Sequence, residues 1–110
     1  MTFDEYQKAA HATSKNTSIG GDKLIYPVLG MGDEVGEVLG KVKKVYRDKD
    51  GSMEAQDKYA IAQELGDVLW YLSETSFQLG FDLSLVAALN IEKLADRADR
   101  GVIGGSGDNR

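Results

Sequence analysis

The sequence predicts an all-α protein, a four-helix-bundle-like protomer with antiparallel helices, and three observations support this prediction. The chain of 110 residues has a single proline and long stretches rich in Ala, Leu, Glu and Lys, which favour helices. Apolar residues recur at three- and four-residue spacing, which is the period of a helix face. Short polar or glycine-rich connections separate four such segments, and no segment shows the alternation typical of a strand.

The first helix is expected over about residues 3–13. Thr2 and Glu5 stand at the spacing of a capping box, in which each side chain accepts a hydrogen bond from the backbone amide of the other residue. Residues 14–22, SKNTSIGGD, follow this helix and are rich in turn-forming residues. They are therefore predicted to form a loop.

The second helix should contain Pro27 in its first turn and run to about Arg47. Its apolar stripe follows alternating steps of four and three residues and consists of Met31, Val35, Val38, Val42 and Val45. Residues 48–52, DKDGS, are interpreted as an exposed turn between helices. They superficially resemble a calcium loop, but the glycine and glutamate that such a loop needs are missing.

A third helix is expected over about residues 54–79 and a fourth over about residues 83–100, with Gly80 and Gly101 as their ends and Asp82 as the N-cap of the fourth. The third helix has two apolar sides. One side carries Ile61, Leu65, Val68, Leu69 and Leu72, and the other carries Trp70, Phe77 and the nearby Phe81. One small bundle can hardly cover both sides, so the sequence predicts self-association.

Composition limits the class of protein. Hydrophobic residues make up 42% and charged residues 28% of the chain, which is typical of one soluble globular domain, here residues 1–110 with a glycine-rich tail at 101–110. The absence of cysteine excludes disulfides and thiolate metal sites, and the single His11 excludes a multi-histidine centre. A di-iron carboxylate bundle is excluded because it needs Glu-x-x-His pairs.

Charge and hydropathy restrict location and partners. No apolar run approaches the roughly 20 residues of a membrane span, and the N-terminus lacks the features of a signal peptide, so a cytoplasmic protein without a membrane partner is expected. The net charge of −5 argues against a nucleic-acid partner, because the backbone of nucleic acids is anionic. A small phosphorylated ligand is compatible with this charge if metal ions neutralise the local acids.

Two pairs of acids stand inside apolar helical segments. Glu34 and Glu37 share a face of the second helix, and Glu64 and Asp67 share a face of the third. In antiparallel helices all four carboxylates can converge, and their repulsion would cost several kcal/mol unless a cation offset it. Mg²⁺, or Mn²⁺ as a substitute, prefers such oxygen ligands. A solvated helix face is the alternative interpretation, and the apolar setting of both pairs makes it the less favoured one.

Glycines accompany both pairs of acids. Gly32, Gly36 and Gly40 recur along the second helix, and Gly66 stands between the two acids of the third. Glycine inside a helix costs about 0.5–1 kcal/mol relative to alanine, so a compensating role is expected. The prediction is that these glycines let the two helices approach closely enough for their carboxylates to reach one ion.

The fourth helix carries a polar and basic stripe at the same spacing. This stripe consists of Asn90, Lys93, Arg97 and Arg100. Beside a metal–carboxylate cluster it can hold phosphates, with Arg forming paired hydrogen bonds and Lys acting as a point charge. Salt bridges to Glu92, Asp96 and Asp99 on the same helix are an equally good interpretation.

The segments that carry these residues resemble a known family. They are GDEVGEV at 32–38, ELGDVLWYL at 64–72 and NIEKLADRADRG at 90–101. From about Leu29 to Arg110 the chain resembles the MazG-like nucleotide pyrophosphohydrolases of the all-α NTP pyrophosphatase superfamily, and it matches in full their ExxE pair followed by an ExxD pair. The ending GGSGDNR is similar to that of small single-domain members, so the chain is expected to be complete.

The resemblance implies an activity, which is Mg²⁺-dependent hydrolysis of a nucleoside triphosphate to the monophosphate and pyrophosphate. By motif match Glu34, Glu37, Glu64 and Asp67 would bind the metal, which would bridge phosphate oxygens and acidify a bound water. Glu37 is the candidate that orients this water or takes its proton. Housecleaning of damaged nucleotides is one role that this activity would suit.

The resemblance also implies contacts to phosphates. Lys93 and Arg97 match the phosphate-binding positions of the family, and Asn90 matches the residue that precedes them. Lys41, one turn beyond Glu37, is a further candidate.

Other positions carry over from the resemblance less directly. Tyr71, one turn after Asp67, is expected to touch the sugar or a phosphate. Trp70 is a candidate for stacking on a base, although a tryptophan at helical spacing is more typical of a core or interface. The tail residues Asp108, Asn109 and Arg110 are candidates for closing over the phosphates, and Arg100 of the basic stripe is a further candidate for a substrate contact. His11 is interpreted as a surface residue rather than a base contact.

Members of the superfamily form dimers or tetramers, so the resemblance implies a homodimer or homotetramer, in agreement with the two apolar sides of the third helix. Base preference varies widely among them, and no residue of this chain decides it. A non-catalytic helical interaction module, in which the acids serve only solubility, is the alternative function. It predicts neither stabilisation by Mg²⁺ nor turnover.

Overall fold

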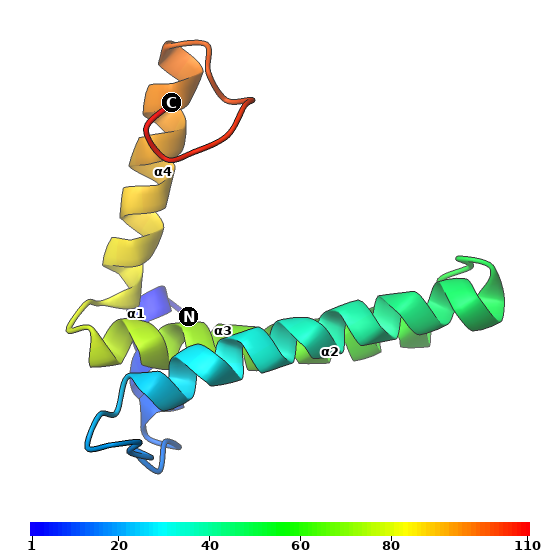
Figure 1. Cartoon of the computed structure of the whole chain (residues 1–110), viewed down its shortest axis with the longest axis horizontal. Coiled ribbons are helices and arrows are strands. Elements are labelled where there is room, and N and C mark those ends of the chain that lie inside the picture. Colours follow the sequence, from blue (N-terminus) through cyan, green and yellow to red (C-terminus); the bar gives the residue numbers. More distant parts are fainter.

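The computed structural model describes all residues, 1–110, and consists of four helices (Figure 1). They are α1 (Phe3–His11), α2 (Ile25–Lys49), α3 (Ala55–Gln78) and α4 (Leu83–Asp99). There is no strand, only one isolated bridge between Ile19 and Asp22. The all-α, bundle-like prediction is confirmed, and each helix begins and ends close to its expected residues. None of these helices has a stretch long and apolar enough to cross a membrane.

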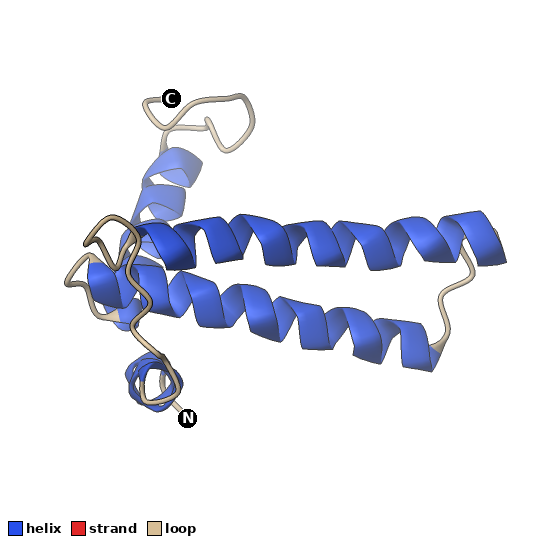
Figure 2. Cartoon of the chain, turned by 60° about the horizontal axis from the view of Figure 1, so that its bottom comes forward, coloured by secondary structure: helices blue, strands red, loops and turns tan.

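The two longest helices, α2 and α3, lie side by side and run in opposite directions (Figure 2). The chain reverses between them at Asp50 and Gly51, whose φ angles of 52° and 79° lie in the left-handed region. Lys49 Nζ donates to Asp57 Oδ2 across this turn over 2.9 Å. The antiparallel arrangement places the middle of α2 opposite the middle of α3, where the predicted acids lie.

Helix α1 crosses one end of this pair and packs against α3 and α4 (Figure 1). Its predicted capping box is confirmed, because Glu5 N donates to Thr2 Oγ1 at 3.1 Å and Thr2 N donates to Glu5 Oε1 at 3.2 Å. Both bonds are local in sequence. Spacing alone was therefore sufficient to predict how this helix begins.

The N-terminus of α4 is held by side chains of α1. Leu83 N donates to Oε1 of the buried Gln7 at 3.1 Å, and Ser84 N donates to Asp4 Oδ1 at 3.0 Å. The expectation that Asp82 caps this helix with its side chain is wrong, because Asp82 occupies the N-cap position without a side-chain bond. Acceptors from a distant segment replace the local cap.

Beyond its first turns, α4 projects away from the α2–α3 pair (Figure 1). It packs against α1 and α3 and has no contact with α2. The Cα radius of gyration is 16.9 Å, whereas a compact chain of this length has about 13 Å. The accessible surface of 7653 Å² likewise exceeds the roughly 6,000 Å² of a compact protein of this mass. The single chain is therefore an open bundle.

Few apolar side chains are fully buried within the single chain. They are Pro27, Val45 and Leu83. Large apolar residues that are more than half exposed include Leu29, Leu39, Tyr46, Tyr59, Leu65, Leu89 and Ile91. They come from α2, α3 and α4, and together they expose more apolar surface than the scattered residues of an ordinary monomer.

Candidate metal centre and adjoining cavities

Three of the four predicted metal ligands converge between α2 and α3. Glu34, Glu64 and Asp67 each offer a carboxylate oxygen, and these oxygens lie within 4.8 Å of one another. Glu64 and Asp67 share a face because they stand three residues apart on α3, and Glu34 faces them from α2. Glu37 is one turn further along α2, exposed to solvent and outside this group. We call Glu34, Glu64 and Asp67 the carboxylate cluster.

Negative charges surround Glu34 in the cluster. Partial burial raises the pKa of Glu34, and the negative charges of Asp67, Asp33, Glu64 and Glu37 raise it further. A divalent cation with oxygen preference would reverse this repulsion, because all three side chains are hard anionic ligands. The residues present therefore fit Mg²⁺ or Mn²⁺.

Lys41 is the cation nearest to the cluster. Its Nζ lies 3.3 Å from Glu64 Oε1, and the lysine side chain is 38% exposed. The lysine predicted as a phosphate contact thus lies beside the predicted metal ligands. Because the lysine side chain reaches solvent, it can leave Glu64 for another partner without becoming a buried, unpaired charge.

Tyr71 and Trp70 form the wall of a cavity of about 340 Å³ that also contacts Glu34 and Asp67. A hydrogen bond with Tyr26 raises the pKa of Tyr71 to about 12, with burial and the charges of Tyr26, Glu34 and Asp33 acting in the same direction. Tyr71 therefore stays a neutral phenol at physiological pH. Its single O–H proton is donated to Tyr26, so Tyr71 can donate to a ligand in the cavity only in exchange for that bond, and it cannot serve as a base there.

The glycines that allow close packing at this site are not the predicted ones. A Cβ atom built on Gly32, Gly36, Gly40 or Gly66 would meet no atom within 4 Å, so the prediction that these glycines bring α2 and α3 together is wrong. The close approach occurs at Gly30, where a Cβ atom would lie 2.2 Å from Cε1 of Tyr71. Gly30 thus makes room for the tyrosine ring beside the cluster.

A Gly30→Ala substitution is expected to lower the free energy of unfolding by about 1–3 kcal/mol, because the new methyl group overlaps the ring of Tyr71. Gly32→Ala is the matched control: it adds the same methyl group to the same helix, facing open space. Alanine there should raise stability by up to about 1 kcal/mol through helix propensity. Urea unfolding of both variants measures the difference, and equal effects would contradict the assigned role of Gly30.

The basic side chains of α4 pair with the tail rather than with the cluster. Lys93 Nζ and Arg97 Nη2 both lie 3.1 Å from Asp108 Oδ1, and Arg97 also donates to the backbone oxygens of Gly107 and Asp108. The alternative interpretation, in which these two cations form salt bridges within α4, is therefore wrong for Lys93 and Arg97. Within one chain they also do not reach the cluster, since α4 lies away from α2.

The other predicted substrate contacts on α4 and in the tail also lie away from the carboxylate cluster. Arg100 Nη2 lies 2.9 Å from Asp96 Oδ2, as the alternative of salt bridges within the helix predicted, and it also bonds to the backbone oxygen of Arg110. Asn90 and Asn109 are exposed and make no side-chain hydrogen bond. None of these residues lies at the carboxylate cluster of its own chain.

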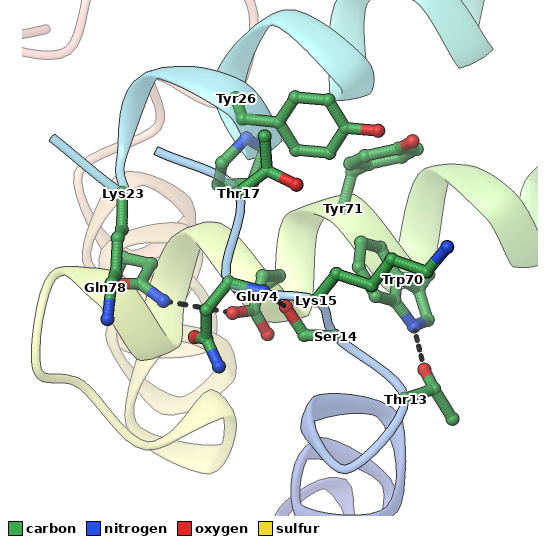
Figure 3. Close-up of a pocket in the computed structure, with 12 residues that line it drawn as sticks. Thr13, Ser14, Lys15, Thr17, Lys23, Tyr26, Trp70, Tyr71, Glu74 and Gln78 are labelled. Carbon is green, nitrogen blue, oxygen red and sulfur yellow. Dashed lines mark hydrogen bonds between the residues drawn. The ribbon is translucent and has the colours of Figure 1, made fainter. Parts of the chain in front are cut away.

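A second, more enclosed cavity of about 230 Å³ lies between the loop after α1 and the C-terminal half of α3 (Figure 3). Residues 13–17 line one side, α3 lines another with Trp70, Tyr71, Glu74 and Gln78, and Lys23, Tyr26 and Pro27 line the cavity at and just before the start of α2. Trp70 Nε1 donates to Thr13 Oγ1 at 2.9 Å, which ties the loop to α3. The two cavities share Trp70 and Tyr71, so they adjoin each other.

The buried Glu74 pairs with the half-buried His11, and the sequence interpretation missed this pair. His11 Nδ1 lies 3.0 Å from Glu74 Oε2, its ring stacks on Phe77 at 3.6 Å between centroids, and the Glu74 side chain is only 5% exposed. The interpretation of His11 as a surface residue is therefore wrong. Glu74 stands seven residues after Asp67 on the same face of α3, and this spacing was the available signal.

Comparison with known proteins gives one family and one relative. The sequence profile of the MazG nucleotide pyrophosphohydrolase domain matches residues 28–102. The "Gene 37 protein" of Mycobacterium phage L5 is 44% identical over 114 aligned residues, and the alignment covers 100% of both chains. No solved structure matches this chain. The match covers α2 from residue 28 onward and all of α3 and α4, and it therefore includes every residue of the carboxylate cluster.

Proposed function

The chain belongs to the MazG nucleotide pyrophosphohydrolase family, and from this premise we propose that it cleaves a nucleoside triphosphate between its α- and β-phosphates in a Mg²⁺-dependent reaction. The products would be the nucleoside monophosphate and pyrophosphate. The observation that carries the proposal is the convergence of Glu34, Glu64 and Asp67 within 4.8 Å. Mn²⁺ is the expected substitute, because it shares the preference of Mg²⁺ for oxygen ligands.

In this proposal the metal and Glu37 have separate roles. When bound, the metal would offset phosphate charge and acidify a water molecule. Glu37 is exposed and pairs with no side chain, so we assign to it the orientation of this water and the acceptance of its proton. The same carboxylate can instead turn toward the cluster and serve as a fourth ligand.

Two further side chains would hold the substrate near the cluster. Tyr71, kept as a phenol by its raised pKa of about 12, would exchange its bond to Tyr26 for a hydrogen bond to the sugar or a phosphate. Lys41 Nζ would exchange Glu64 for a phosphate oxygen once a metal binds that carboxylate. Both residues are already positioned at the cluster in the free chain.

Self-association belongs to the same proposal. The exposed apolar side chains of α2, α3 and α4 support a homodimer or homotetramer in which neighbouring subunits cover them. In such an assembly α4 of one subunit can lie against the α2–α3 pair of another. That arrangement would bring Asn90, Lys93 and Arg97 to a cluster that they do not reach within their own chain.

Light scattering coupled to size-exclusion chromatography tests the assembly. The expected mass is two or four times the 12.0 kDa of the chain. Leu89→Asp is expected to shift the mass towards the monomer, because it places a charge on an exposed apolar position of α4. A wild-type protein that elutes as a 12.0 kDa monomer would contradict self-association.

The activity itself is tested by a screen of ribo- and deoxyribonucleoside triphosphates with Mg²⁺, in which the products are identified. Monophosphate plus pyrophosphate supports the proposal, whereas diphosphate plus orthophosphate contradicts it. A protein that shows neither turnover nor stabilisation by Mg²⁺ would instead be a non-catalytic interaction module. The cytoplasm, where nucleotide pools need housecleaning, is the location that suits the proposed activity.

A further inference from the structure

The cavity between residues 13–17 and α3 has a carboxylate of its own, Glu74 (Figure 3). It shares Trp70 and Tyr71 with the cavity beside the carboxylate cluster. We propose that this cavity binds the nucleobase, and that Glu74 selects bases that carry an exocyclic amino group over their oxo counterparts. The ligands would be cytosine and adenine nucleotides rather than uracil and hypoxanthine nucleotides. This inference rests on the proposed function, because it assigns the base end of the same substrate.

The spacing along α3 suits a nucleotide. Glu74 lies seven residues after Asp67, which corresponds to two helical turns and about 10 Å along one face. Trp70 and Tyr71 stand between them and line both cavities. A nucleotide with its phosphates at Asp67 would therefore place its sugar beside the two aromatic rings and its base at Glu74.

Glu74 is held in one orientation and keeps an open acceptor position. Its Oε1 accepts hydrogen bonds from Gln78 Nε2 at 3.0 Å and from His11 Nδ1 at 3.1 Å. Its Oε2 accepts only from His11 Nδ1, at 3.0 Å. A carboxylate can accept about four hydrogen bonds, and it donates none when ionised. The position left open at Oε2 therefore suits a donor from a ligand.

An acceptor-only carboxylate at Glu74 distinguishes bases that carry an exocyclic amino group from bases that carry an oxo group at the same position. The exocyclic amino group of cytosine or adenine donates to a carboxylate, whereas uracil and hypoxanthine carry a carbonyl oxygen at the same position. That carbonyl would face the Glu74 carboxylate, acceptor against acceptor, in a site where Glu74 is only 5% exposed. The expected preference is about 10- to 100-fold, which corresponds to one hydrogen bond to a charged group.

A purely structural role for Glu74 is the competing interpretation, since its bond to His11 joins α3 to α1. The two roles differ in what they predict. A structural role affects thermal unfolding and leaves the choice of base unchanged. A selective role changes the ratio of affinities within each amino and oxo pair.

The test is a titration with nucleoside monophosphates in the absence of Mg²⁺. Trp70 is the only tryptophan of the chain and lines the cavity, so its fluorescence reports occupancy. CMP and AMP are expected to bind at least about 10-fold more tightly than UMP and IMP, respectively. Equal affinities within each pair, or no change in fluorescence with any of the four, would overturn the proposal.

A Glu74→Gln variant tests the residue itself. The amide can both donate and accept, so the preference within each pair should fall to within about threefold. Glu92→Gln, an exposed acid on α4, is the matched control and should keep the wild-type ratios. A preference that survives Glu74→Gln contradicts the assignment. If circular dichroism shows that this variant does not fold, the wild-type ratios alone decide.

The result separates this inference from the proposed activity. Binding of monophosphates without metal does not depend on turnover, so CMP and AMP can be preferred even if no triphosphate is cleaved, and only the proposed activity would then fail. Conversely, if CTP and UTP, and likewise ATP and ITP, are cleaved with equal kcat/KM, the activity stands and the selective role of Glu74 fails.

Discussion

Glu64→Gln is expected to reduce Mg²⁺-dependent cleavage of nucleoside triphosphates by about 1,000-fold or more, because the several kcal/mol that a metal contributes to the transition state are lost with one of its ligands. Glu64 belongs to the group of three carboxylates whose oxygens lie within 4.8 Å of one another. The amide keeps the shape of the side chain and removes its charge. Release of pyrophosphate measures the effect.

Glu64→Gln should lose activity without losing thermal stability. Glu64 is one of the charges that raise the pKa of Glu34, so its neutralisation relieves repulsion in the metal-free protein. The melting temperature without metal should therefore be unchanged or higher. Mg²⁺ should raise the melting temperature of the wild type and have little effect on Glu64→Gln, since stabilisation by a ligand depends on its affinity.

Asp33→Asn is the matched control for Glu64→Gln. Asp33 is an exposed acid adjacent to Glu34 that lies outside the carboxylate cluster. Its neutralisation should leave the rate within about threefold, because Asp33 is exposed to solvent and offers no ligand to the cluster. Equal losses in both variants would mean that general negative charge, rather than ligation, matters. Full activity in Glu64→Gln would show that the metal assignment is wrong.

Arg97→Ala is expected to lower kcat/KM for triphosphates by about 100-fold, because hydrogen bonds between a guanidinium and phosphate each contribute about 1.5–3 kcal/mol. Arg97 is 5% exposed, and its Nε has no partner within the chain, so a free donor is buried there. Arg97→Lys should retain part of the activity, since lysine keeps the charge but not the paired donors.

Arg100→Ala is the matched control on the same stripe of α4. Arg100 pairs with Asp96 at an exposed position, so its loss should change kcat/KM by less than about threefold. Arg97 also pairs with Asp108 of the tail, so the melting temperature of Arg97→Ala is measured in parallel to separate a role in substrate binding from a role in anchoring the tail. If Arg97 only anchors the tail, Arg97→Ala lowers the melting temperature and leaves kcat/KM at the wild-type value.

Sequence patterns predicted the features of this chain that depend on near neighbours. The capping box of Thr2 and Glu5 and the helix ends at Gly80 and Gly101 involve residues within one or two turns. Gly80 and Gly101 adopt φ angles of 83° and 69°, which glycine tolerates best. The convergence of Glu34 with Glu64 was also foreseeable, because a short turn forces α2 and α3 to run antiparallel.

The features that sequence patterns did not predict depend on contacts between distant segments. Spacing indicates which residues share a helix face, but it does not set the level at which two helices meet. For that reason Glu37 was expected in the cluster and lies outside it, and the contact of Gly30 with Tyr71 was not foreseen. The pair of His11 and Glu74 spans 63 positions in the chain, which no local pattern reports.

The small interior of the single chain has a consequence for folding. With only Pro27, Val45 and Leu83 buried among its apolar residues, an isolated chain gains little free energy from hydrophobic burial. Most of the apolar burial would then come from association, so folding and assembly would form a single equilibrium that obeys mass action. Dilution would act as a denaturant for such a protein, and its melting temperature would rise with protein concentration.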